Sequence, residues 1–294
     1  MLKGIGFNVY DTGIGRVYTQ QNRTLGQAVD RLATGLRVNK AADDAAGLSI
    51  AEALKTSIKG YEVAEKNIGD GINLVRTAES GLGSISGSLQ RIRELVVQAG
   101  DGSLSGTEKQ ALQDEIDQNL SNIDDASSRT SFNGKTLLNG SSGTVNIQTG
   151  SDAGNTSAIN LSGNFSSSAT TSSGNINEGN IGGSAGESLS NIDVVNGNLN
   201  DILTGVDNAL DNVSAAQSSM GAKENGFTAN LEGLSVQRED ALAARSRIMD
   251  ANYAAEASNA IQSYILRSGA VTLSQQSNMN ARLALNLLPL VSKN

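Results

Sequence analysis

The stretch IAEALKTSIKGYEVAEKNIGDGINLVRTAESGLGSISGSLQRIRELV, residues 50–96, carries one regular apolar pattern. Apolar or small side chains recur about every 3.5 residues, which is the spacing of a coiled-coil seam rather than of a broad globular face. The stretch contains no proline, so every residue can donate its backbone N–H to a continuous helix. We therefore predict one long helix over residues 44–99, with its seam at Ile50, Leu54, Ile58, Tyr61, Ala64, Ile68, Ile72, Val75, Ala78, Leu82, Ile85, Leu89, Ile92 and Val96.

Two further segments offer helical partners for this long helix. Thr107 and Gln110 resemble a capping box, and the apolar spacing that follows predicts a second helix. Heptad-like spacing returns in the C-terminal half at Leu203, Val206, Leu210, Val213, Met220, Phe227, Leu231 and Leu234. We predict a mainly α fold, an elongated rod of long antiparallel helices.

Both ends of the chain are amphipathic as well. One stripe comprises Ile14, Tyr18, Leu25, Ala28, Leu32 and Leu36, and a less regular one comprises Tyr253, Ala257, Ile261, Tyr264, Val271, Met279 and Leu283. Two helices packed only against each other bury little surface, so we expect these stripes to meet other copies of the chain. Pro289 is expected to end the last helix.

The middle of the chain is poor in core-forming residues. TVNIQTG and SAINLSG, residues 144–150 and 157–163, alternate polar and apolar side chains and predict a small β-hairpin. The short tract that follows is rich in Gly, Ser, Thr and Asn and cannot bury enough apolar surface for a core of its own. We expect it to be an exposed insert.

Composition excludes several classes of function. The 294 residues include no His and no Cys, which removes imidazole bases, thiol nucleophiles, disulfides and the usual zinc ligands. A formal charge of −8 opposes binding to nucleic acid, and no run reaches the ~20 apolar residues of a membrane span. The first residues, MLKGIGFNVYDTG, have no apolar core typical of a cleaved secretory signal. We predict no enzyme activity, no cofactor and no metal.

Asp43 and Asp44 are the one adjacent carboxylate pair that invites a chemical interpretation. They stand directly before the long periodic segment, where a carboxylate accepts hydrogen bonds from free helix N–H groups. Catalysis would need further converging acid–base groups, and the sequence shows no such cluster. We interpret the pair as a helix start and hinge.

Five segments resemble bacterial flagellin, in the order of that family and at both ends of the chain. They are RLATGLRVNKAADDAAGLSIAEAL (31–54), LQRIRELVVQA (89–99), SFNGKTLLNG (131–140), ARSRIMDANYAAEASN (244–259) and TLSQQSNMNARLALNLL (272–288). The resemblance implies a subunit that self-assembles into the extracellular flagellar filament for swimming, after secretion by the flagellar type III apparatus. It also implies an inner coiled-coil domain (1–40 and 253–294), a helical rod domain with the hairpin (41–164 and 189–252) and a strongly reduced variable insert (165–188).

The resemblance also implies contacts and partners. Polymerisation contacts are expected at Leu25, Leu32, Leu36, Ile261, Leu283 and Leu287, and the pattern that faces an innate immune Toll-like receptor matches at Gln90, Arg91, Leu95 and Glu115. Further partners by resemblance are an export chaperone, the filament cap and the hook-junction proteins.

Two alternatives stay open at this point. One is a hook–filament junction protein, which shares the terminal helices. The other is a minor or specialised flagellin with a surface-adhesin role, since the exposed tract could bind a ligand. A protease carried in the variable region would need a motif such as HExxH, which a chain without His cannot supply.

Overall fold

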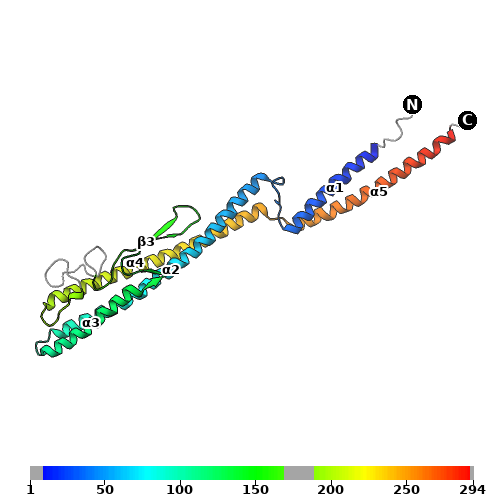
Figure 1. Ribbon diagram of the computed structural model, residues 1–294. Coiled ribbons are helices and arrows are strands. Elements are labelled where there is room, and N and C mark those ends of the chain that lie inside the picture. Colours follow the sequence, from blue (N-terminus) through cyan, green and yellow to red (C-terminus); the bar gives the residue numbers. More distant parts are fainter. Residues whose placement is uncertain (1–8, 169–188, 292–294) are drawn as a thin grey trace. The chain divides into compact units, whose positions relative to one another are not determined.

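The computed structural model describes residues 9–168 and 189–291, and these residues form a mainly α structure (Figure 1). Five α-helices account for most of them: α1 (Val9–Thr34), α2 (Ala45–Ala99), α3 (Gly106–Arg129), α4 (Leu199–Met249) and α5 (Tyr253–Val291). The strands are β1 (Ser131–Phe132), β2 (Lys135–Thr136), β3 (Gly143–Gln148) and β4 (Thr156–Leu161), and a 3-10 turn, η1, covers Leu189–Asn191. The predicted class and the long helix over residues 44–99 are confirmed.

The chain divides into two compact units. One contains the described residues up to 56 together with those from 240 onward, and the other contains residues 57–239. Helices α2 and α4 contribute to both units. The boundaries between these units lie inside α2 and α4, after residues 56 and 239. The domain boundaries predicted from the sequence, near residues 40 and 252, lie in the short connections that follow α1 and α4.

Within residues 57–239, α2 and α4 run antiparallel, as their side-chain ion pairs show. Arg76 pairs with Glu224 at 2.7 Å, and Arg93 pairs with Asp207 at 2.6 Å. Arg238 binds Glu65 at 3.1 Å. In these three pairs, a higher residue number in α2 goes with a lower residue number in α4, as expected for antiparallel helices. These pairs establish the register of the two helices.

The seam predicted on α2 forms the core of this unit from Ile58 to Val96. All its members in that range are buried except Tyr61 and Ile72, which are half-buried. From Tyr61 onward they pack in one core with residues of α3, α4 and the strands. The first two seam positions differ: Ile50 is 53% exposed and Leu54 is half-buried, because they precede the unit whose core the seam builds.

Helix α3 begins with a capping box two residues before the predicted one. The side chain of Ser105 accepts a hydrogen bond from the N–H of Glu108, and the Glu108 carboxylate accepts one from the N–H of Ser105. The bonds that the N–H and the hydroxyl of Ser105 donate to the Glu108 carboxylate lower the pKa of Glu108. Thr107 is therefore already inside the helix, and the prediction of a box at Thr107 and Gln110 was wrong. Both pairs satisfy the spacing rule, so only the extended backbone of Ser105 identifies the cap.

The predicted hairpin is present as β3 and β4, which pair antiparallel from Gly143 opposite Leu161 to Gln148 opposite Thr156. One face of the hairpin is buried against the helices, with Ile159 and Leu161 in the core. Phe165 and Ser167, at the beginning of the predicted insert, are also buried. The rest of that insert, residues 169–188, lies outside the described residues.

Glycines in α2 allow the strands and their loops to approach the helix closely. A Cβ atom at Gly81 would lie 2.6 Å from Leu138 and would also collide with Thr130. At Gly60 it would lie 2.8 Å from the Cβ of Ser151, in the turn between β3 and β4. Gly83, by contrast, has open space around the same position. The cost of glycine to the helix is therefore offset by packing at Gly60 and Gly81 but not at Gly83.

We expect alanine at Gly81 and alanine at Gly83 to have opposite effects on stability. Gly81→Ala should lower the free energy of unfolding by about 1–3 kcal/mol, because the added methyl overpacks the contact with Thr130 and Leu138. Gly83→Ala should raise it by up to about 1 kcal/mol, since alanine is the better helix former. Urea unfolding followed by circular dichroism measures both. Equal effects from the two variants would contradict this account.

Candidate self-association surface in the terminal helices

Helices α1 and α5 lie side by side (Figure 1). The fully buried residues of the pair are small. Ala28 of α1 and Ser263 and Ala270 of α5 are buried. Larger α1 residues such as Leu25 and Leu32 are only half-buried. Small side chains let two helices approach closely, but they bury little apolar area.

Many large apolar side chains of α5 remain exposed beside α1. Ile261 is 63% exposed and Leu283 is 61% exposed. The same holds for Tyr253, Tyr264, Ile265, Leu266, Val271, Leu273 and Met279 of α5, and for Val17, Tyr18 and Val29 of α1. We call these exposed side chains together the outward apolar face. So many large apolar side chains left exposed on two paired helices indicate an interaction site.

The six predicted polymerisation residues therefore fall into different environments. Ile261 and Leu283 belong to the outward apolar face. Leu25 and Leu32 are half-buried, and Leu36 packs on a small separate core that contains Val38, Ala51 and Met249. The side chain of Leu287 lies outside the described part of the chain. No single surface collects all six.

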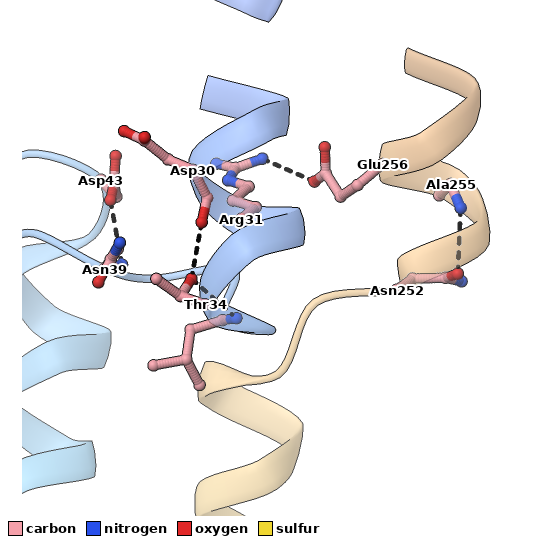
Figure 2. Close-up of polar contacts among 9 residues, drawn as sticks. Asp30, Arg31, Thr34, Asn39, Asp43, Asn252, Ala255 and Glu256 are labelled. Carbon is pink, nitrogen blue, oxygen red and sulfur yellow. Dashed lines mark hydrogen bonds and ion pairs between the residues drawn. The ribbon is translucent and has the colours of Figure 1, made fainter. Parts of the chain in front are cut away.

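The ends of α1 and α5 are joined by a polar network (Figure 2). Arg31 donates to Glu256 at 2.9 Å, and this ion pair is largely shielded from solvent. Asn252 caps α5, because its side-chain oxygen accepts a hydrogen bond from the N–H of Ala255. Arg37 adds a backbone N–H bond to the carbonyl of Met249 at 2.6 Å. The two connections between helices are thus hydrogen-bonded to each other.

Asp43 and Asp44 lie at the beginning of α2 and make different contacts. Asp44 directly precedes the helix, and its Oδ1 accepts a hydrogen bond from the N–H of Gly47 at 2.8 Å. Asp43 faces backward and accepts from the N–H groups of Lys40 at 2.9 Å and Asn39 at 3.1 Å (Figure 2). The bond from Lys40 is the main reason that the pKa of Asp43 lies below its usual value.

Three of the four receptor candidates gather on one exposed patch of α2 and α3. Arg91 pairs with Glu115 of α3 at 2.6 Å and with Glu94 at 2.9 Å, and Gln90 is exposed beside it. The hydrogen bond to Glu115 is the main cause that raises the pKa of Arg91. Leu95 is different: it is only 1% exposed and belongs to the core. A direct contact between Leu95 and a partner therefore does not fit this structure.

None of the helices in the described part of the chain combines the length and apolar character that a membrane span requires. Over residues 9–168 and 189–291, acidic side chains nowhere gather in a group of three or more that could hold a metal ion.

Comparison with known proteins identifies the family. The model of the bacterial flagellin N-terminal helical region matches residues 8–143, and that of the C-terminal helical region matches residues 203–288. The chain belongs to the flagellin family. It is a structural subunit of the flagellar filament, which serves motility, and it polymerises with copies of itself. The predicted family and function are thereby confirmed.

Relatives of similar length support this assignment. The chain is 35% identical to flagellin of Bacillus subtilis over 281 residues, which cover 88% of this chain and 91% of that protein. It is 33% identical to flagellin of Xenorhabdus nematophila over 315 aligned positions, which cover 96% and 99% of the two chains. The short length of this flagellin agrees with the predicted reduction of the variable region.

The fold also resembles that of a solved structure assigned to a flagellar hook-associated protein of Vibrio parahaemolyticus. The TM-score is 0.56 and the identity is 14%, with 71% of this chain and 100% of the other covered. At this identity the likeness concerns the fold alone. Nothing in the comparisons favours the junction-protein alternative over a filament flagellin.

The sequence did not predict which side of α5 remains exposed in this flagellin. The spacing in the C-terminal segment showed an apolar stripe but not its direction. The small residues at Ala257, Ala260, Ser263 and Ala270 were the available signal, since they mark the face of α5 that is half-buried or buried. The opposite face, which carries Ile261, is then free for other contacts.

Proposed function

We propose that subunits of this flagellin assemble through the outward apolar face of α1 and α5. The observation that supports the proposal is the exposure of the large α5 side chains, of which Ile261 and Leu283 are typical. Contacts between α1 and α5 within one subunit leave these side chains in water. A heterologous contact that does not close into a ring generates an open helical filament, so the same face can be buried along the whole polymer.

The size of the hydrophobic effect is sufficient for such assembly. Each large aliphatic side chain that becomes fully buried contributes roughly 1.5–3 kcal/mol. The outward apolar face carries several such side chains in every subunit. Even after the entropy cost of association, a modest contribution from each would hold a filament together.

The substitution Ile261→Ser is expected to raise the critical concentration for filament assembly by roughly tenfold or more, because it removes one buried aliphatic side chain from the contact. Sedimentation of filaments at increasing subunit concentration measures the effect. Val236→Ser is the matched control, because Val236 is 57% exposed on α4 and is not part of this face. Normal assembly of the Ile261 variant would contradict the proposal.

Export and capping of the filament complete the proposed role. We propose secretion by the flagellar type III apparatus, with an export chaperone, the filament cap and the hook-junction proteins as partners. Asp43 and Asp44 are proposed to hold the connection between α1 and α2 at the point where the long helix begins. The support is their hydrogen bonding to Lys40 and Gly47 on either side.

We also propose that the exposed patch of Gln90, Arg91 and Glu115 is recognised by a host Toll-like receptor. It is supported by the family pattern at these positions and by the exposure of all three side chains. Leu95 acts there only as a buried support for α2.

Substitution of the patch should weaken receptor signalling. The double variant Arg91→Ala, Glu115→Ala is expected to lower signalling in reporter cells about tenfold or more, because charged contacts at an interface centre carry a large share of binding. Arg129→Ala, Asp125→Ala removes an ion pair elsewhere on α3 and serves as the control. Unchanged signalling from the first variant would count against recognition at this patch.

A further inference from the structure

An apolar groove runs along the outside of the α1 and α5 pair. It measures about 650 Å³ and lies between residues 13–17 of α1 and 265–273 of α5. Gly13, Val17, Ile265, Gly269 and Leu273 line it, and the remaining lining residues are also apolar. No charged or hydrogen-bonding side chain contributes. A groove of this composition suits the apolar side of a helix.

Two glycines, Gly13 and Gly269, line this groove. A Cβ atom at Gly13 or Gly269 would meet nothing within 4 Å, so neither glycine is required by packing inside the subunit. Open glycines also occur elsewhere in the helices, and glycine alone therefore does not mark a contact. At these two positions, however, the missing side chains coincide with the apolar groove. An approaching helix could come closer to the backbone here than at a position with a side chain.

Charge decides which helix fits the groove. Helix α1 carries Asp11, Arg16, Arg23, Asp30 and Arg31 along its length. In α5, residues 268–281 contain no charged side chain. Arg267, just before them, is engaged within its own subunit by Asn22 and by the ring of Tyr264. Burying a charge without a partner is costly, so the uncharged segment of α5 is the better occupant.

We propose that the groove receives residues 268–281 of α5 from a second copy of the chain, with Gly13 and Gly269 as the positions of closest approach. This inference rests on the proposed function and assigns one of its contacts. The exposed Val271 and Met279 of the incoming helix supply the apolar side chains that enter the groove. The contact is heterologous, since the groove of one copy takes a different surface of the next.

Filling the groove tests the contact without disturbing the subunit. Gly269→Leu places a side chain into open space and improves helix propensity, so helix content and thermal unfolding of the monomer should not decrease. The critical concentration for assembly should rise about tenfold or more. Gly26→Leu is the matched control. Gly26, in α1, likewise has open space around its Cβ position, but it does not line the groove. Equal assembly of the Gly269 and Gly26 variants would overturn the inference.

Disulfide mapping identifies the occupant directly, because the natural chain contains no cysteine. Subunits with Gly269→Cys are assembled with subunits that carry Met279→Cys or Val271→Cys, and the filaments are then oxidised. A disulfide between the two kinds of subunit is expected for at least one pair. Cross-links that form only to Gln20→Cys subunits would assign the groove to α1 and overturn the inference. The absence of any cross-link at Gly269→Cys in assembled filaments would also overturn it.

The inference and the proposed function can fail separately. If Ile261→Ser impairs assembly while Gly269→Leu does not, the outward apolar face remains the assembly surface and only the groove contact is wrong. If Ile261→Ser assembles normally, the proposed function itself fails. The cysteine mapping then still shows which surface the groove meets.

Discussion

A chain that lacks residues 1–35 is expected to remain folded but to form no sedimentable filaments. The deletion removes α1, and with it Val17, Tyr18 and Val29 of the outward apolar face and the helix that α5 packs against. The core of residues 57–239 loses none of its buried members, since these extend from Ala64 to Leu234. Assembly should therefore be lost while cooperative unfolding of that core is retained. Sedimentation and thermal circular dichroism measure the two properties.

Deletion of residues 260–294 is the companion experiment. It removes most of α5, including Ile261 and Leu283, and should have the same effect on assembly. The full-length chain under identical conditions is the control. Sedimentable filaments from both truncated chains would show that the terminal helices are not the assembly surface.

The largest effect on folding is expected at Phe227 of α4. Its side chain is only 1% exposed and is the largest among the fully buried ones of the described chain. It packs on α2, where its ring would lie 3.4 Å from a Cβ atom at Gly71. Phe227→Ala should lower the free energy of unfolding by about 3–5 kcal/mol, because it removes buried apolar area and leaves a cavity.

Urea unfolding measures this loss, and Val236→Ala on the same helix provides the control. Val236 is 57% exposed, and we expect its truncation to change the free energy of unfolding by no more than about 0.5 kcal/mol. A loss below about 1 kcal/mol for Phe227→Ala would mean that the packing around Gly71 relaxes to fill the space.

The sequence predicted the helices and their burial best where a local period repeats many times. The seam of α2 was correct from Ile58 to Val96, because a side chain that recurs every 3.5 residues stays on one face of a helix. The heptad-like spacing of α4 likewise located Val206, Val213, Met220 and Phe227 in the same core. The hairpin followed from alternation in two short runs.

Features that depend on single residues were predicted less well. The capping box was predicted two residues too late, at Thr107 instead of Ser105, because several polar residues in that loop satisfy the same spacing rule. Helix α5 continues to Val291 instead of ending at Pro289. Proline removes one hydrogen-bond donor and its ring crowds the carbonyl four residues earlier, and only two helical residues follow Pro289.

The candidate sites required the fold itself. Leu95 shares a motif with Gln90 and Arg91, but the packing of α3 and α4 on α2 places it in the core while they remain exposed. Arg91 meets Glu115 only because α3 folds back along α2. Such contacts join residues that are far apart in the chain, and no local spacing specifies them.

The sequence by itself determined that this chain forms long helices and contains no His or Cys, and its motifs indicated the flagellin family. These properties follow from local periodicity and composition, which act within a few residues. Only the tertiary structure decided which side of each helix is used. In α5, the small residues at Ser263 and Ala270 allow close packing on α1, so Ile261 and Leu283 are left in water. An apolar stripe that is buried within the subunit and one that stays exposed have the same spacing in the sequence. They differ only in whether another helix of the same subunit covers them.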